Sequence, residues 1–160
     1  MFPGAFFMRW QPVPPMNSSD ATLRNILSTT KTIAIVGISH NPERPSHGVA
    51  LFLQSKGYRI VPINPGLAGQ NLLGEEVFAS LGDIPAALGP IDMVDIFRRS
   101  DAVGPVVDDA LAHLMERGLR TIWMQLGVIA PEAAARAEAA GLTVVMDRCP
   151  AIEHPRLMPA

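Results

Sequence analysis

The segment that decides the fold is TIAIVGISHNPERPSHGVALFLQSKGYRIVPIN, residues 32–64. It begins with an apolar run over 32–39, rich in β-branched residues, which is typical of a strand buried on both faces of a parallel sheet. A helix is predicted from Ser46. It ends at Gly57, because glycine favours the end of a helix. Residues 58–64, YRIVPIN, predict a second strand. This order of strand, helix and strand predicts a right-handed crossover unit.

The same alternation of strands and helices continues along the chain. Further strands are predicted over 91–97, 119–127 and 142–147, with helices beginning near Ser100 and at Pro131. Serine and proline both suit the first positions of a helix. The pattern predicts an α/β fold: a Rossmann-like, doubly wound, mainly parallel five-stranded sheet with helices on both faces. Ligands of such sheets bind at the carboxyl ends of the strands.

The remaining segments contain many of the 15 prolines. Residues 1–18 are apolar but broken by proline, and we expect a tail, an arm whose aromatic side chains dock elsewhere, or a natural translation start at Met16. Residues 19–160 are expected to form one domain that ends in a short proline-bearing tail from Arg148. The irregular stretch 67–89 predicts a small hairpin or turn and a short helix.

Composition excludes several classes of protein. The 160 residues are 48% hydrophobic and 18% charged, which excludes a disordered or fibrous chain. One cysteine, Cys149, excludes a disulfide framework and a cysteine-built zinc site. The net charge of −2 offers no basic surplus for nucleic acid, and no apolar run reaches the roughly 18 residues that span a membrane. We therefore expect a cytoplasmic protein with no nucleic-acid, membrane or metal partner.

Polar and basic residues gather where the predicted strands end. Gly37 follows the first strand and permits a tight turn, and the helix that begins near Ser46 directs a positive dipole end to the same place. Arg98 and Arg99 follow the third strand, and Arg148 follows the fifth. Each feature alone is also compatible with an ordinary turn or a solvated side chain. Together they indicate a site for a large anionic ligand.

The pattern is not that of a dinucleotide site. Gly-x-Gly-x-x-Gly is absent after the first strand, and the second strand ends in Asn64 rather than in an acid that would hold ribose hydroxyls. An NAD(P)-binding oxidoreductase therefore remains an alternative that these residues disfavour.

Four segments in one order carry a resemblance: VGISHNPERPSHGVALFLQSKGYRIVPINPG, IDMVDIFRRSDAV, IWMQLGV and VVMDRCPAIEH. From about Asp20 to Leu157 the chain closely resembles the stand-alone CoA-binding domain family of bacteria. That family is similar to the N-terminal CoA-binding domain of the succinyl-CoA synthetase alpha subunit. The resemblance implies a Rossmann-like domain that binds coenzyme A or an acyl-CoA.

The resemblance also implies positions for the ligand. The phosphates would lie by Gly37, Ile38, Ser39, Arg44, Pro45 and Ser46. The nucleotide would lie by Asn64 and Pro65, and the pantetheine by Gln125 and Gly127. Phe97, Arg98 and Arg99 would border the ligand across the sheet, with Arg148 as a further cation at the same edge.

The expected role is a non-catalytic or regulatory CoA-binding protein. In the synthetase a second domain with a phosphorylated histidine follows, and we expect none after Ala160. An accessory subunit that completes an acyl-CoA ligase with a separate chain is a further alternative, and a homo-oligomer is possible. His40 and His47 flank the first loop and are loop residues or phosphate contacts.

Cys149 lies beside Arg148 at the predicted ligand edge. A neighbouring cation favours the reactive thiolate, which near the pantetheine sulfur would form a mixed disulfide with CoA. The alternative that the sequence favours is a half-buried structural thiol.

Overall fold

A parallel sheet in the order β2-β1-β5-β6-β7 forms the centre of the computed structural model, which describes residues 19–159. All four neighbouring pairs of strands are parallel. The predicted Rossmann-like, doubly wound sheet is confirmed, whereas the predictions for residues 1–18 and Met16 lie outside the described residues. The strands are β1 Thr32–Val36, β2 Arg59–Ile63, β5 Met93–Ile96, β6 Thr121–Met124 and β7 Thr143–Val145.

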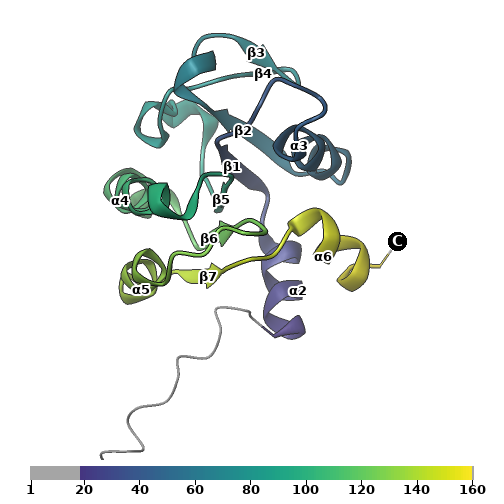
Figure 1. The fold of residues 1–160 in the computed structure, drawn as a ribbon, viewed down its shortest axis with the longest axis vertical. Coiled ribbons are helices and arrows are strands. Elements are labelled where there is room, and N and C mark those ends of the chain that lie inside the picture. Colours follow the sequence, from purple (N-terminus) through teal and green to yellow (C-terminus); the bar gives the residue numbers. More distant parts are fainter. Residues whose placement is uncertain (1–18, 160) are drawn as a thin grey trace, which may run out of the picture.

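Within residues 19–159, five α-helices cover the two faces of the sheet. In Figure 1, α4 and α5 lie on one side of the strands, while α3 and α6 lie on the other side. The third helix on that second side is α2, which packs against α6. The helices are α2 Asp20–Thr29, α3 Pro45–Ser55, α4 Val103–His113, α5 Pro131–Ala139 and α6 Pro150–Leu157.

The three central strands of the sheet are buried along their whole length. All residues of β1, β5 and β6 are buried, as expected for strands covered on both faces. Side chains alternate between the two cores: Val94 and Ile96 enter the core under α4 and α5, whereas Met93 enters the other core.

The order of the strands creates a switch point between β1 and β5. The chain leaves β1 for α3 on one face, and it leaves β5 for α4 on the other face. The two loops therefore diverge and leave room between them at the carboxyl edge, which is where open α/β sheets bind ligands.

The stretch 67–89 contains the predicted hairpin. β3 (Asn71–Leu72) and β4 (Glu75–Glu76) pair antiparallel, and Leu73 and Gly74 both have positive φ, as a type I′ turn requires. Where one short helix was predicted, two short 3₁₀ helices follow, at Leu81–Asp83 and Ala86–Leu88.

The expectation of a C-terminal tail was wrong. Residues 150–157 form α6, which packs on α2 and α3. Pro150 occupies the first turn, where its missing N–H costs no hydrogen bond. The His154 ring packs edge-on against the Phe52 and Tyr58 rings, with 5.9 Å between the ring centroids in each pair. Burial and the nearby positive Lys56 lower the pKa of this histidine.

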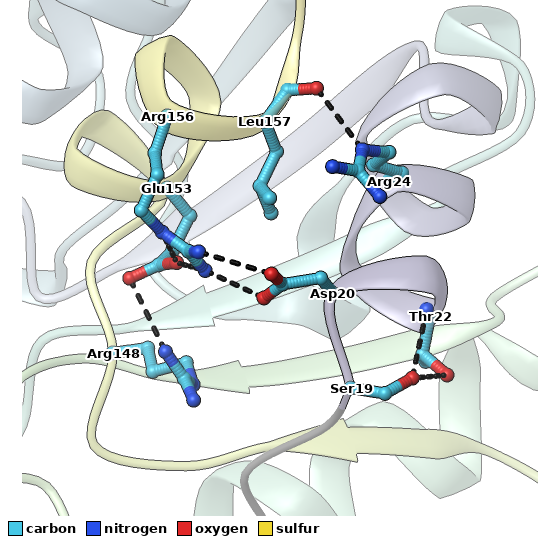
Figure 2. A network of polar contacts seen from close by, with 8 residues as sticks. All are labelled: Ser19, Asp20, Thr22, Arg24, Arg148, Glu153, Arg156 and Leu157. Carbon is cyan, nitrogen blue, oxygen red and sulfur yellow. Dashed lines mark hydrogen bonds and ion pairs between the residues drawn. The ribbon is translucent and has the colours of Figure 1, made fainter.

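A chain of charges fastens α6 to α2 (Figure 2). Buried Glu153 accepts a hydrogen bond from Arg156 Nη2 at 2.6 Å and pairs with Arg148 Nη1 at 3.4 Å. Arg156 also donates to both carboxylate oxygens of Asp20, at 2.8 and 3.2 Å. This bidentate hydrogen bonding lowers the pKa of Asp20. The described domain is thus closed by contacts between its first and last helices.

Glu153→Gln tests this closure. The substitution leaves two arginines facing a neutral amide, and we expect the free energy of unfolding to fall by about 2 kcal/mol, because one buried partner of an ion network is lost. Denaturant unfolding measures the change. Glu132→Gln, which removes an exposed i,i+4 pair with Arg136, is the matched control and should be near neutral. Equal effects of the two substitutions would contradict the account.

Asp95 is a carboxyl group buried in the middle of the sheet. It lies on β5 between Ile35 of β1 and Trp123 of β6. Its side chain is fully buried, and neither oxygen has a hydrogen-bond partner among the described residues. Burial raises the pKa of Asp95 well above its usual value, because desolvation disfavours the charged carboxylate.

The raised pKa predicts a direction for stability against pH. A folded-state pKa above the unfolded value gives a contribution that is complete at acidic pH and is lost as pH rises through the folded pKa. Asp95→Asn removes the ionisation, so its stability relative to the parent should increase from acidic to neutral pH. Thermal melts across that range measure this difference. Asp108→Asn, at an exposed position, should show no such trend, and a flat difference for Asp95→Asn would refute the prediction.

Candidate functional site

A cavity of about 490 Å³ opens at the switch point, between the loop after β1 and the first turn of α3. We call it the α3 cavity. It brings together most residues predicted at the first two strand ends. Its lining consists of Gly37, Ile38, Ser39, His40, Arg44, Pro45, Ser46, Asn64, Gly66, Leu67 and Phe97.

The floor of the α3 cavity is a close crossing of two backbones. Phe97 N–H donates to the Val36 carbonyl at 2.8 Å, and Gly37 N–H donates to the Ile63 carbonyl at 2.9 Å. Gly37 has φ +88°, and a Cβ there would lie 2.3 Å from the Phe97 oxygen. Only glycine satisfies both the positive φ and this approach.

The loop after β1 is held by its own side chains. Ser39 N–H donates to Ser46 Oγ at 2.9 Å, and Asn41 N–H donates to Ser39 Oγ at 3.0 Å. Asn64 donates from Nδ2 to the Ile38 carbonyl at 2.7 Å and accepts from Gly66 N–H at 2.8 Å. The loops after β1 and β2 are therefore tied together before any ligand arrives.

The entrance to the α3 cavity is positively polarised. Arg44 is the N-cap residue of α3, its side chain makes no capping hydrogen bond, and Pro45 follows at the first turn. The helix directs its positive dipole end to the same place. Within residues 19–159, ion pairs involve Arg99 but neither Arg44 nor Arg98. These features suit an anionic group.

A second cavity of about 470 Å³ adjoins the first, and Pro45 and Phe97 line both. We call it the Cys149 cavity. Gln125 is 6% exposed, and its Oε1 is buried with no hydrogen-bond partner among the described residues. The other residues of the lining are mainly apolar or basic: Val49, Arg98, Arg99, Leu126, Val128 and Cys149.

A third cavity of about 560 Å³ lies by α4 and includes the predicted residues Pro65 and Arg98. Arg98 therefore borders the carboxyl edge on two sides. The rest of the lining of this third cavity is mainly apolar, with two carboxylates: Val36, Ile63, Ala79, Ser80, Leu81, Pro105, Val106, Asp108 and Asp109.

Two predicted residues line none of these three cavities. Arg148 directs its guanidinium to Glu153, and its carbonyl accepts a hydrogen bond from Trp123 Nε1 at 2.8 Å. Gly127 shapes the turn after β6, where its N–H donates to Asp147 Oδ1 at 2.7 Å. The structure thus uses Arg148 to hold α6, and the expected cation beside Cys149 is already paired with a carboxylate.

Sequence reasoning missed several lining residues. Val49 lies one turn after Pro45 on α3, so an i,i+4 count would have found it. Gly66 and Leu67 belong to a 3₁₀ turn, Pro65–Leu67, capped by Asn64. Leu126 and Val128 also line a cavity. They flank Gly127, which was predicted as a site residue without them.

The described residues are also compatible with neither a metal cluster nor a membrane-spanning helix. Within residues 19–159, no cluster of three or more histidine, cysteine, aspartate or glutamate side chains could hold a metal ion. No helix in that range has the length and apolar character needed to cross a membrane.

The fold and the cavities define a Rossmann-like domain with a polar, cation-bearing cleft at its switch point. A family model described as a CoA binding domain matches residues 31–155, and the chain belongs to this family. A bacterial relative, the uncharacterized protein YneT of Bacillus subtilis, is 38% identical over 138 residues, which cover 86% of this chain and 96% of the relative.

Solved structures share the fold. The protein cell-free ID.343 from Thermus thermophilus is 40% identical with a TM-score of 0.80, over 88% of this chain and all of that chain. A dinucleotide-forming acetyl-coenzyme A synthetase 1 of Ca. Korarchaeum cryptofilum is 25% identical with a TM-score of 0.56. That match covers 71% of this chain but only 25% of the synthetase.

Gly37→Ala tests the backbone crossing under the α3 cavity. Gly69 has nearly the same φ, +86°, but open space around its missing Cβ. Both alanine substitutions carry the backbone strain of a positive φ, and only Gly37→Ala adds a steric clash with backbone. We expect Gly37→Ala to lower the free energy of unfolding by about 2 kcal/mol more than Gly69→Ala does. Comparable losses in denaturant melts would count against the crossing.

Proposed function

We propose that this protein binds coenzyme A or an acyl-CoA at the carboxyl edge of its sheet, as a non-catalytic or regulatory binding protein. The observation that carries the proposal is the pair of adjoining cavities. One is polar with Arg44 in its lining, and the other combines apolar side chains and a buried amide with Arg98 and Arg99. CoA has matching parts: phosphates at one end, and a long pantetheine arm with amides at the other.

The phosphates are assigned to the α3 cavity. Arg44 offers a guanidinium at its entrance, and the first turn of α3 offers the helix dipole. The loop that carries Ser39 is already fixed by Ser46, so little ordering cost is incurred on binding. The adenosine is assigned to the side of Asn64 and Pro65, at the end of β2.

The pantetheine arm is assigned to the Cys149 cavity. The unpaired Oε1 of Gln125 needs a hydrogen-bond donor, and an amide N–H of pantetheine supplies one. Val49, Leu126 and Val128 give the apolar walls that suit the methylene groups of the arm.

Two alternatives have weaker support. For an NAD(P)-dependent oxidoreductase, the end of β2 offers Asn64, whose amide is already bonded to Ile38 and Gly66, and no acid for ribose hydroxyls. For an accessory ligase subunit, the support is the similarity to one quarter of an acetyl-CoA synthetase.

Thermal stability in the presence of ligands tests the proposal. A ligand at 100 times its dissociation constant stabilises the folded state by about 2.7 kcal/mol. We expect CoA and acetyl-CoA to raise the melting temperature, and dephospho-CoA and NAD to raise it less. Acetyl-CoA should remain intact after prolonged incubation with the protein. A larger shift with NAD than with CoA would overturn the proposal.

Arginine variants test which side chains bind CoA, with Arg59→Ala as the control. Arg44→Ala should weaken CoA binding about 10- to 100-fold, because a charge-assisted hydrogen bond is lost. Arg98→Ala should also weaken it, and Arg99→Ala less so, because Arg99 already pairs with Asp101 at 3.3 Å. Arg59→Ala, at a position on the sheet edge where arginine pairs with Glu75, should leave CoA affinity unchanged.

A further inference from the structure

We propose that Cys149 takes CoA onto the protein as a mixed disulfide, by exchange with CoA disulfides, so that the cleft holds CoA covalently under oxidising conditions. This inference rests on the proposed function, because it requires the pantetheine arm to enter the Cys149 cavity.

The position of Cys149 fits this role. It is the one cysteine of the chain, it is 5% exposed, and it lines the cavity. Its carbonyl accepts hydrogen bonds from Ile152 and Glu153 N–H at 3.0 Å each, so its backbone is fixed at the start of α6. Its side chain makes no capping hydrogen bond to that helix. The sulfur is therefore held in place and is not used in capping.

A second observation points to a ligand in the same cavity. Gln125 is buried beside the same space, and its Oε1 has no partner within the described part of the chain. A buried acceptor without a donor is costly, and a ligand that carries an amide N–H relieves that cost. Pantetheine carries amide N–H groups and ends in sulfur. The cavity thus offers an acceptor for the amide and a thiol for the terminal sulfur.

The burial of Cys149 gives selectivity. The apolar side chains Val49, Leu126 and Val128 line the same cavity as Cys149, and a small charged disulfide such as oxidised glutathione gains nothing from them. A CoA disulfide is held at its phosphates by the α3 cavity, which adjoins through Pro45 and Phe97. Binding therefore raises the effective concentration of that disulfide at Cys149.

The chemistry is a thiol–disulfide exchange. The Cys149 thiolate attacks one sulfur of CoA disulfide, a bond forms between Sγ and that sulfur, and the incoming S–S bond breaks. The second CoA leaves as a thiolate and takes up a proton. One disulfide is consumed and one is formed, so no further oxidant is required. A reducing thiol reverses the step and restores free Cys149.

The test compares two disulfides by intact mass under non-reducing conditions. The wild-type protein is incubated with CoA disulfide or with glutathione disulfide at equal concentration. We expect one CoA adduct per chain, formed about tenfold or more faster than the glutathione adduct, and lost on treatment with dithiothreitol. Arg44→Ala should slow the CoA reaction and leave the glutathione reaction unchanged.

Two controls separate this inference from the proposed function. Cys149→Ser should give no adduct while reduced CoA still raises its melting temperature. In the wild-type protein, acetyl-CoA, which has no free thiol, should protect Cys149 from iodoacetamide. Stabilisation by CoA without an adduct, or equal rates with the two disulfides, would overturn the inference and leave the proposed function standing. Absence of any stabilisation by CoA or acetyl-CoA would overturn both.

Discussion

The site depends on the crossing of two backbones at Gly37 and Phe97. Parallel strands β1 and β5 are neighbours in the sheet, yet the chain leaves them toward opposite faces. Their exits lie within hydrogen-bond distance, Phe97 N–H to the Val36 carbonyl, and a side chain at residue 37 would collide with the Phe97 oxygen. Because residue 37 has no Cβ, the backbones that follow β1 and β5 can approach this closely at the carboxyl edge of the sheet. Phe97 lines both the α3 cavity and the Cys149 cavity.

The position of the first residues of α3 depends on the loop that follows Gly37. The loop that leaves Gly37 is short, and it is braced by Ser39, Ser46 and Asn64 through hydrogen bonds of 2.7 to 2.9 Å. The brace places Arg44 and Pro45 at the helix start, so the dipole and the guanidinium face the same opening. For the proposed ligand, the phosphates would therefore meet a backbone dipole and a few arginines, which agrees with a chain whose net charge is slightly negative.

The sequence predicted those parts of the fold that local chemistry determines. The apolar runs of β1 and β5 and the glycine after β1 are recognisable because parallel strands and tight turns each demand particular residue types. Helix α6 was not predicted, because Pro150 and Pro155 suggest a loop and its stability comes from long-range contacts such as Arg156 with Asp20. For the same reason Arg148 was expected at the ligand edge. Its charge signalled a cation, but only the folded chain shows that buried Glu153 already pairs with it.

Helix α6 therefore has two structural roles that the sequence did not separate. Its ion network with Asp20 closes the domain. Its N-cap residue, Cys149, forms part of a cavity wall. Because Arg148 and Glu153 lie on either side of Cys149 in the sequence and pair with each other, the backbone between them is clamped at both ends. The same network extends to α2, since Asp20 and Glu153 share the guanidinium of Arg156. The stability of the closure and the position of the thiol are thus properties of one network, although its charges lie outside the cavity that they help to shape.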